Sequence, residues 1–379
     1  MEQKYDVLLV GAGLFNAVLA HKFATFGKSV LVVERREDIG GNCYTEPLHG
    51  IDVHKYGAHI FHTSNVEAWE FANKFAKFNQ FVNSPVAMTL DTSTYYPRPK
   101  VYNLPFNMNT FNELWGCATP DEAKRKIEEE TRPYIKAVYD NLEEKALSMV
   151  GKTIYEKVIK GYTEKQWHCR CDQLHPDIIS RIPLRFNFDN NYFNDTFQGI
   201  PEHGYTEWIR NMLSDATVIT GVDYLKERDK WDAKADLVFF SGMVDEFFNF
   251  ENGRLHYRSL EFRTEVKDTG NYQGVAVVNY PGLEVSYTRT IEHRHFMSSL
   301  RKAIAPENRT IVTTEYPADM KPGMEAYYPV ADTISRERYG SYMNMRPRNV
   351  VFTGRLGRFE YNDMDDTIIK ALAVAEEYR

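Results

Sequence analysis

Cysteine is scarce in this chain, and no pattern typical of a metal site is present. The 379 residues include only four cysteines, at Cys43, Cys117, Cys169 and Cys171. Such sparse use predicts reduced thiols and a cytoplasmic protein rather than a disulfide scaffold. His168 precedes the last pair, but a zinc site needs a second ligand pair at a recognised spacing, and none follows. We therefore expect no bound metal.

The sequence also lacks a basic excess and a long apolar run. The formal net charge is −7, which argues against nucleic acid as a partner, because nucleic-acid-binding proteins carry a basic surface. No window approaches the roughly 20 apolar residues of a membrane-spanning helix. The apolar run near the N-terminus is too short for a signal peptide. An anionic small ligand is compatible with this charge, since two well-placed arginines can bind it.

The length and the aromatic content are less selective. A chain of 379 residues predicts two or three domains rather than one core. The 24 tyrosines and 23 phenylalanines suit stacking on the rings of a ligand, although core packing uses the same residues.

The N-terminus carries a strong local pattern of strand, glycine turn, helix and strand. Residues 6–10 and 29–33 are typical of buried parallel strands, and Gly11-Ala12-Gly13 stands between the first strand and the helix. These glycines let the backbone approach a pyrophosphate at a helix N-terminus, and Glu34 can bind a ribose. The pattern predicts dinucleotide binding, although Asn16 replaces the third glycine of the usual fingerprint.

The residues after Glu34 indicate which dinucleotide binds. Arg35-Arg36 is followed by Gly40-Gly41-Asn42, and this order of acid, spacer and glycine pair resembles FAD-binding oxidoreductases of the glutathione-reductase type. The two arginines could instead bind the phosphate of NADP, but Glu34 would repel that phosphate. We therefore expect FAD. Further on, His59 and His62 stand three apart, and we interpret them as groups along one edge of a ligand.

The middle of the chain predicts a small helical domain. Thr119-Pro120-Asp121-Glu122 is a complete helix start, with a cap, a proline and a capping-box acid. The helical region is expected to begin near Thr110, and two later helices are expected to stop at Gly151 and Gly161. Before it, residues 91–100 are polar and predict a loop.

From Arg181 the pattern changes to that of an α/β protein with an antiparallel sheet. Residues 181–188, 260–266, 274–280 and 310–316 alternate as half-buried strands do. Buried strands at 237–240 and 350–353, and a helix at about 363–378, extend the first domain. We expect a discontinuous Rossmann-like FAD-binding domain (1–80, 205–242 and 335–379), a helical domain with a mobile lid (103–175) and an antiparallel β-sheet substrate domain (81–102, 176–204 and 243–334).

Two interpretations of the segment Lys160–Trp167, Lys-Gly-Tyr-Thr-Glu-Lys-Gln-Trp, stay open. One is a corner between two helices, with a stop at Gly161, a cap at Thr163 and Trp167 in the core. The other is a ligand platform, in which the aromatic rings offer flat faces and Arg181 offers a fork for a phosphate.

Taken together, these segments resemble the UDP-galactopyranose mutase family over nearly the whole chain. The glycine turn is common to many folds, whereas Lys160–Trp167 followed by Arg181 and Arg289 is specific. The other matching segments are Tyr56–Thr63, Leu104–Thr110, Arg181–Pro183, Asp189–Phe193, Tyr287–Arg289, Ile291–His293, Tyr327–Pro329 and Gly354–Leu356.

The resemblance implies a FAD-dependent isomerase that works with reduced flavin and with no net redox change. Such an enzyme interconverts UDP-galactopyranose and UDP-galactofuranose through a covalent adduct between flavin N5 and the sugar, for cell-surface polysaccharide synthesis. It further implies a nucleotide-sugar substrate, an external reductant such as NAD(P)H, and a homodimer.

The resemblance also implies roles for individual residues. Arg181 and Arg289 would bind the diphosphate and stabilise departing UDP, and His62 and Asp363 would lie beside the flavin and the sugar. The other substrate contacts would be Asn83, Val158, Ile159, Tyr162, Thr163, Trp167, Tyr192, Tyr328 and Tyr361. The FAD contacts would be Gly11, Gly13, Phe15, Glu34, Arg35, Gly41, Asn42, His59, Ile60, Tyr224, Arg355, Asn362, Asp363, Met364, Asp365, Asp366 and Thr367.

Residues 168–180 resemble the mobile lid of the family, whose closure would exclude water. The chain departs from the family at Asn16, at His168, where a glycine is common, and at Met243, where a proline is common. These departures leave the sugar open, because a mutase acting on dTDP-fucopyranose would need the same chemistry.

Two other classes of protein compete with this interpretation. A flavin oxidoreductase of the amine-oxidase type shares the N-terminal pattern but needs no pair of phosphate-binding arginines. A nucleotide-sugar binder without catalysis would keep Arg181 and Arg289 but would not need the FAD segments.

Overall fold

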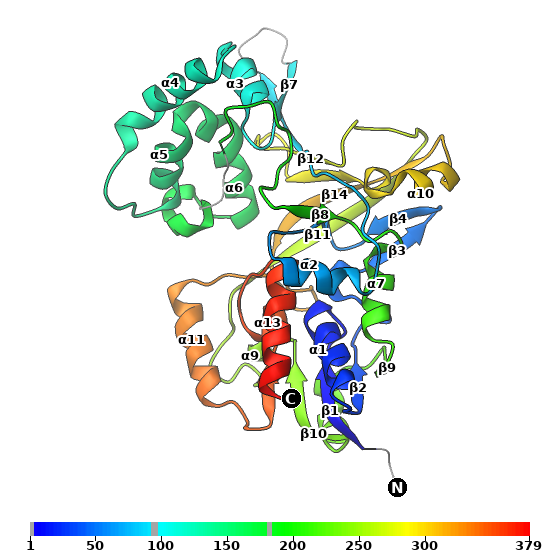
Figure 1. Ribbon diagram of the computed structural model, residues 1–379. Helices are drawn as coiled ribbons and strands as arrows, with labels where there is room; N and C mark the ends of the chain where they lie inside the picture. The colour runs from blue at the N-terminus through cyan, green and yellow to red at the C-terminus, as the bar shows by residue number, and fades with distance from the viewer. Residues whose placement is uncertain (1–3, 92–97, 180–183) are drawn as a thin grey trace.

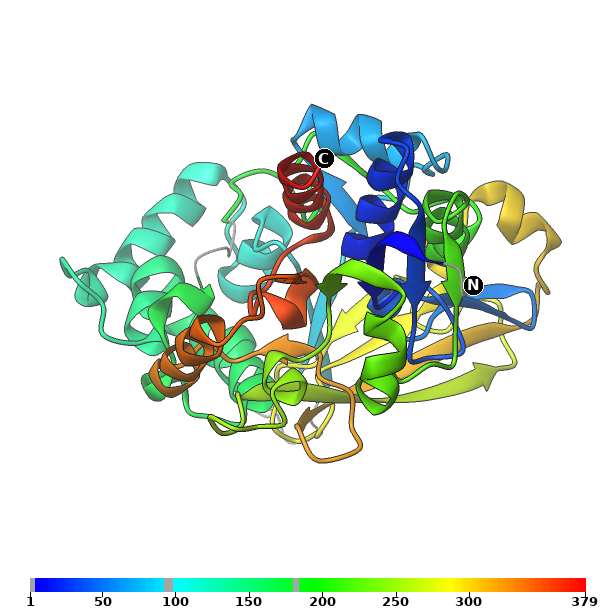
Figure 2. The same ribbon diagram turned by 90° about the horizontal axis from the view of Figure 1, so that it is seen from below.

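The computed structural model describes residues 4–91, 98–179 and 184–379, which form a mixed α/β fold. A parallel sheet with helices on its faces holds both ends of the chain, a larger mixed sheet lies beside it, and a helical lobe stands to one side (Figure 1). Figure 2, seen from below, also shows the helical lobe to one side of the parallel sheet.

The parallel sheet has the strand order β16-β10-β1-β2-β9. Its helices bury both faces, as the continuous apolar runs predict: Val7 and Leu9 belong to one core cluster, and Leu8 and Val10 to the other. The strands at 237–240 and 350–353 and the helix at 363–378 are confirmed within one or two residues. The strands are β1 (Tyr5–Val10), β2 (Val30–Val33), β9 (Thr217–Ile219), β10 (Ala235–Phe240) and β16 (Val350–Phe352).

Helices of this region lie on both sides of the parallel sheet. In Figure 1, α1 and α13 lie side by side against one face, and residues of α9 and α11 belong to the core cluster of the other face. The helices are α1 (Leu14–Thr25), α2 (Val66–Asn73), α7 (Gly204–Met212), α8 (Arg228–Asp232), α9 (Val244–Phe247), α11 (Thr333–Asn344), α12 (Gly354–Gly357) and α13 (Met364–Glu377).

The larger sheet has the order β15-β11-β14-β13-β12-β6-β7, and its pairs are antiparallel except β12 with β6. It contains the strands predicted near residues 260–266, 274–280 and 310–316. Its strands are β6 (Val86–Asp91), β7 (Arg98–Asn103), β11 (Tyr257–Lys267), β12 (Val277–Asn279), β13 (Arg289–Glu292), β14 (Thr310–Asp319) and β15 (Tyr328–Pro329). Two small sheets pair β3 (Thr45–Leu48) with β4 (Ile51–His54), and β5 (Phe61–Thr63) with β8 (Phe197–Gly199); α10 spans Ser299–Ile304.

One prediction about this region is wrong, and another is contradicted only at its two ends. The described part of 181–188 is not a strand: Leu184 makes one isolated bridge, and the following residues bend. The reason is Arg185, whose guanidinium donates to the carbonyls of Asn191 and Phe193 and so folds the chain into a loop. The expected loop at 91–100 is flanked by β6 and β7, which reach into it; residues 92–97 lie outside the described part.

The helical lobe contains α3 (Met108–Trp115), α4 (Pro120–Thr131), α5 (Leu142–Ile154), a π-helical turn (Tyr155–Ile159) and α6 (Lys160–Trp167). The capping box at Thr119 and Glu122 is confirmed. Helix α5 continues past Gly151 with a kink, at φ 76° and ψ 173°. Residues 171–173 and 176–179 form two short 3₁₀ turns.

The predicted helix stop at Gly161 and the cap at Thr163 are wrong, because both residues lie inside α6. A Cβ at Gly161 would lie 2.3 Å from the carbonyl oxygen of Pro281. The glycine is therefore needed for a close approach between the helix and a loop, and not for a left-handed turn.

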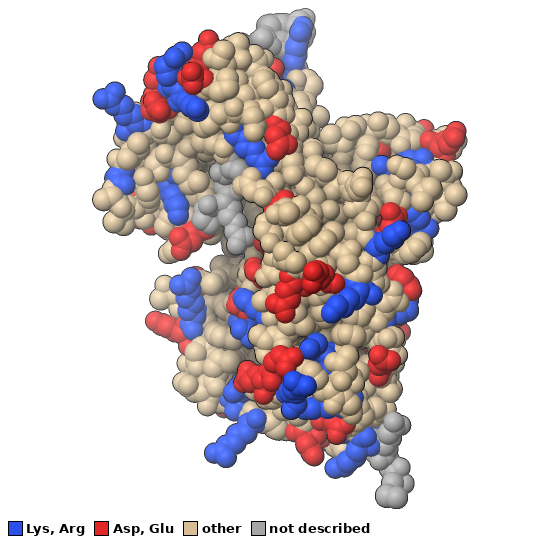
Figure 3. All heavy atoms as spheres, in the orientation of Figure 1, with Lys and Arg blue, Asp and Glu red and all other residues tan. Residues whose placement is uncertain are grey.

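On the face shown in Figure 3, basic and acidic side chains are interspersed rather than gathered by sign. Among the described residues, no helix is long and apolar enough to cross a membrane. The expected domain boundaries and the mobility of the lid stay predictions.

Asn16, which replaces the third glycine of the fingerprint, fastens α1 to the parallel sheet. Its fully buried amide donates to the carbonyls of Val10 and Gly11, each at 2.9 Å, and its carbonyl accepts from the Thr353 hydroxyl at 2.9 Å. One side chain thus joins the ends of β1 and β16 to the helix between β1 and β2.

We expect Asn16→Ala to lower the free energy of unfolding by about 2–3 kcal/mol, because it leaves buried carbonyls without a donor. The measurement is urea unfolding followed by circular dichroism. Asn73→Ala is the control, since Asn73 is exposed and donates only to the Trp69 carbonyl of its own helix; it should change stability by less than about 0.5 kcal/mol. Equal stabilities of the two variants would contradict the role of Asn16.

Candidate active site

Two adjacent cavities open where the three regions meet. The larger has a volume of about 1080 Å³, and the smaller about 260 Å³. His59, Arg355, Asn362 and Met364 line both. A single extended ligand, or two ligands in contact, can therefore occupy them together.

The smaller cavity lies over the glycine turn. Gly11 has φ +98°, and a Cβ there would lie 2.1 Å from the Ser241 hydroxyl. A Cβ at Gly41, where φ is +56°, would lie 3.1 Å from the Cα of Gly13. Side chains at these positions would collide with neighbouring protein atoms, so the glycines let the turn pack closely beneath the cavity. We call this turn the glycine cradle.

The predicted FAD residues gather around these two cavities. Those lining the smaller one are Gly11, Gly13, Phe15, Glu34, Arg35, Gly41, Asn42, His59, Tyr224, Arg355, Asn362, Met364 and Thr367. Ile60, Asp363, Asp365 and Asp366 line the larger one. The N-terminus of α13 contributes to the walls of both cavities, and a helix N-terminus favours a phosphate.

Glu34 shapes the turn as well as facing the smaller cavity. Its carboxylate accepts the N–H of Ala12 at 2.7 Å and the N–H of Arg36 at 2.8 Å. Each oxygen keeps a second lone pair, so a ribose hydroxyl can still donate to it. Arg35 and Arg36 both pair with Glu325, at 3.2 and 3.0 Å, which weighs against the alternative of an NADP phosphate at this position.

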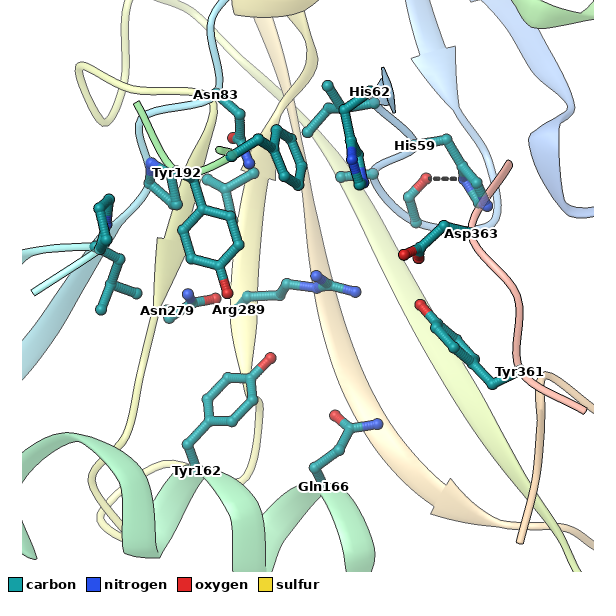
Figure 4. A pocket seen from close by; sticks show the side chains of 18 of the residues that line it. His59, His62, Asn83, Tyr162, Gln166, Tyr192, Asn279, Arg289, Tyr361 and Asp363 are labelled. Atoms are coloured by element: carbon teal, nitrogen blue, oxygen red, sulfur yellow. Dashed lines mark hydrogen bonds between the residues drawn. The ribbon is translucent and has the colours of Figure 1, made fainter. Parts of the chain in front are cut away.

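The larger cavity is lined by residues from distant parts of the chain. In Figure 4, Tyr162 and Gln166 rise from α6 toward Arg289 of β13, while Tyr192 approaches from the opposite side. The predicted substrate residues that line it are Asn83, Val158, Ile159, Tyr162, Thr163, Trp167, Tyr192, Arg289, Tyr328 and Tyr361, together with His62. Arg181 lies outside the described residues.

Arg289 is held by Glu315 on the neighbouring strand. The two residues are directly paired across β13 and β14, and Nε of Arg289 lies 2.9 Å from Oε2 of Glu315. The contact lacks the alignment of a hydrogen bond, and both Glu315 oxygens are buried without a hydrogen bond within the described part. Burial acts to lower the pKa of Arg289, but the Glu315 carboxylate raises it above its ordinary value. Arg289 therefore stays cationic in the cavity wall.

Neutral hydrogen-bonding groups surround this cation. Burial raises the pKa of Tyr162 to about 12 and also raises the pKa of Tyr328, so both phenols stay protonated donors. The side-chain oxygens of Asn83 and Asn279 are buried with no hydrogen-bond partner within the described residues. Unpaired buried acceptors are uncommon in native proteins, and here they line a cavity where a ligand can donate to them.

Two neighbours hold His62 in the wall of the larger cavity. Its Nδ1 lies 2.8 Å from the Asp195 carboxylate, and its ring stacks on Phe193 at 3.7 Å between centroids. The other Asp195 oxygen accepts from the Ser64 hydroxyl at 3.0 Å. Since the carboxylate accepts from Nδ1, the remaining ring nitrogen is left for a ligand.

Sequence reasoning missed several residues that line this cavity, among them Gln166, Asn279, Phe193 and Asp195. Gln166 could have been found, because it shares the helical face of Tyr162 at a spacing of four residues. Asn279 lies in a short strand, and no local pattern marks it. Among the described residues, no group of three or more His, Cys, Asp and Glu side chains could hold a metal ion.

His59, which lines both cavities, is linked to His54 and His293 by hydrogen bonds. His59 donates from Nδ1 to the Gly57 carbonyl at 2.9 Å (Figure 4), which leaves Nε2 as an acceptor. The backbone N–H of His59 donates to His54 at 3.2 Å, and that of His54 donates to His293 at 3.2 Å. Burial lowers the pKa of His59 to about 4 and of His293 to about 3, and it lowers the pKa of His54 well below its ordinary value.

From the lowered pKa values of these histidines we predict that the folded protein loses stability in acid. Between pH 6.5 and about 4, the unfolded chain binds protons that the folded protein excludes, so the free energy of unfolding decreases as the pH falls through this range. His293→Gln should flatten the decrease, because glutamine keeps hydrogen-bonding groups but does not titrate. Urea unfolding at several pH values measures this, with His203→Gln at an exposed histidine as the control. A slope that is unchanged in His293→Gln would refute the assignment.

Comparisons with known proteins relate the chain to described families. A family model described as UDP-galactopyranose mutase matches residues 157–361, and a model of NAD(P)-binding Rossmann-like domains matches residues 9–75. The chain is 35% identical to a protein named probable UDP-galactopyranose mutase from Klebsiella pneumoniae, over 98% of this chain and 94% of that protein. It is 32% identical to dTDP-fucopyranose mutase from Escherichia coli, over 98% of each.

A crystal structure of reduced UDP-galactopyranose mutase shares the fold. The match has a TM-score of 0.70 and covers 99% of this chain and 95% of the other, at 12% sequence identity. Together the two family models span the glycine turn under the smaller cavity and most of the walls of the larger one.

Proposed function

The chain belongs to the UDP-galactopyranose mutase family of flavin-dependent isomerases, and from this premise we propose that it interconverts UDP-galactopyranose and UDP-galactofuranose. The observation that carries the proposal is the cationic Arg289 opposite the aromatic face of α6, in a cavity that adjoins a dinucleotide cradle. An amine oxidase has no need for such a diphosphate-binding arrangement.

The smaller cavity and the junction fit FAD, because the glycine cradle, the acceptor capacity of Glu34 and the N-terminus of α13 match a ribose and a pyrophosphate. When bound and reduced, FAD supplies the nucleophile for the anomeric carbon of the sugar. We propose that Arg355 and His59, which line both cavities, lie at the flavin. Since His59 is neutral with Nε2 free, it can accept a hydrogen bond there without adding charge.

In this proposal the larger cavity binds the nucleotide and the sugar. Tyr162 stacks on the base, and Arg289 binds the diphosphate with Tyr192, Tyr328 and Tyr361 donating to it. Negative charge grows on the diphosphate as UDP departs, so a fixed cation stabilises the transition state more than the bound substrate. We keep Arg181, by the family resemblance alone, as the second arginine.

The dTDP-linked alternative has a specific observation in its favour. The relative that is named dTDP-fucopyranose mutase is 32% identical over 98% of each chain, nearly as similar as the UDP-galactopyranose mutase relative at 35%. We propose the UDP-linked substrate because the family model that matches residues 157–361 carries that description. Discrimination of one hydroxyl requires only a few contacts.

The remaining parts of the proposal are the lid, the assembly and the location. We propose that residues 168–180 close over the substrate, that the protein is a homodimer supplied with electrons by an external reductant, and that it works in the cytoplasm in cell-surface polysaccharide synthesis. The four cysteines are free thiols, which supports a reducing compartment.

We expect the protein to bind FAD and to convert UDP-galactofuranose to UDP-galactopyranose only when the flavin is reduced. The measurement is anaerobic incubation with dithionite-reduced protein, with oxidised protein beside it, followed by chromatography. dTDP-fucofuranose is tested in parallel. Conversion of the dTDP sugar alone would favour the dTDP-linked substrate. Oxidation of an amine with reduction of the flavin would instead indicate an oxidoreductase.

We expect Arg289→Lys to lower kcat/KM by about 10²–10³-fold, because an ammonium cannot bind the diphosphate with the two-pronged geometry of a guanidinium. Lysine is preferred to alanine, since Glu315 would otherwise stay buried without a cation. Bound flavin should be unchanged. The control is Arg210→Ala, at an exposed arginine that pairs with Glu207; near-normal turnover of Arg289→Lys would remove Arg289 from the reaction.

A further inference from the structure

The ammonium group of Lys165 lies among four backbone carbonyls of one loop. From Nζ the distances are 2.5 Å to the oxygen of Tyr280, 2.7 Å to Gly282, 3.2 Å to Val285 and 2.8 Å to Tyr287. All four belong to the connection between β12 and β13. We call residues 280–288 the carbonyl loop.

This arrangement depends on the positive charge. Four carbonyl dipoles that point at one spot repel each other unless a cation lies between them, and hydrogen bonds to a charged donor are stronger than neutral ones. Without the ammonium, partly buried carbonyls would lose their donor and the loop would favour another conformation. Lys165 therefore organises the carbonyl loop and does not merely rest on it.

A second contact joins the same face of α6 to the same loop. Gly161 precedes Lys165 by four residues and so lies above it on the helix. A Cβ at Gly161 would lie 2.3 Å from the Pro281 oxygen and 3.4 Å from side-chain atoms of Leu283. Gly161 and Lys165 do not line the larger cavity. Their presence in the Lys160–Trp167 segment is explained by contact with the carbonyl loop.

The carbonyl loop joins two residues of the larger cavity. Asn279 ends β12 and Arg289 begins β13, and the two are directly paired. On α6, Tyr162 and Gln166 face the cavity, whereas Gly161 and Lys165 contact the loop. The position of the aromatic platform relative to the arginine therefore depends on how the loop is held.

We propose that Lys165 is a positioning residue for nucleotide diphosphate: through the carbonyl loop it sets the separation between the base platform at Tyr162 and the diphosphate cation at Arg289. The inference rests on the proposed function for the identity of the ligand. Lys165 itself touches neither base nor phosphate, because its donors are directed at the loop.

The test is isothermal titration of UDP into flavin-loaded protein, with kcat and KM measured on the reduced enzyme. In Lys165→Met the apolar stem stays and the charge is removed. We expect the Kd for UDP and the KM to rise by about ten- to a hundredfold, with flavin content unchanged. Lys157→Met is the matched control, since Lys157 is an exposed lysine just before α6, and its Kd should equal that of the wild type.

Gly161→Ala tests the same loop without removing a charge. The new methyl group would push the Pro281 carbonyl away, so the Kd for UDP should rise here as well, even if Lys165→Met does not fold. A purely structural role would reduce the amount of folded, flavin-bound protein and leave the Kd of the folded molecules unchanged. That result in Gly161→Ala, or in a folded Lys165→Met, would overturn this inference alone. A wild-type protein that binds neither UDP nor dTDP would overturn the proposed function, and this inference with it.

Discussion

The buried pairing of Arg289 with Glu315 is the constraint around which the larger cavity is arranged. Two charges on adjacent strands, 2.9 Å apart, are costly to bury unless both are compensated. Here Glu315 is fully buried and its oxygens lack hydrogen bonds within the described residues, so the pair is incompletely satisfied by the protein. The guanidinium also lines the larger cavity, so it can bind an anionic ligand there while Glu315 keeps it charged.

The two cavities are joined because the chain crosses between its regions several times. The parallel sheet takes strands from the beginning, the middle and the end of the chain, and α13 directs its N-terminus at the junction. The larger sheet supplies Asn279 and Arg289, and the helical lobe supplies Tyr162. A dinucleotide cradle on the parallel-sheet region therefore adjoins the larger cavity, to whose walls all three regions contribute.

Prediction from the sequence succeeded where the signal was local and failed where a distant contact changed its meaning. The strand, turn and helix around Gly11 and the capping box at Thr119 depend on neighbouring residues, and the structure has both. Gly161 was misread as a helix stop, since the reason for the glycine is a carbonyl of Pro281 about 120 residues away. The alternation after Arg181 was misread as a strand, because Arg185 bonds to carbonyls of its own loop.

The sequence by itself determined most element types and the glycine turn, because periodicity, caps and glycine turns act over a few residues. Its resemblance to a family supplied the residues expected at a flavin and a diphosphate. Only the tertiary structure decided which of these residues meet. The pairing of Arg289 with Glu315 depends on strand register, and the carbonyls around Lys165 lie 115 to 122 residues further along the chain. Such contacts arise from how sheets and helices pack, and no local pattern encodes them.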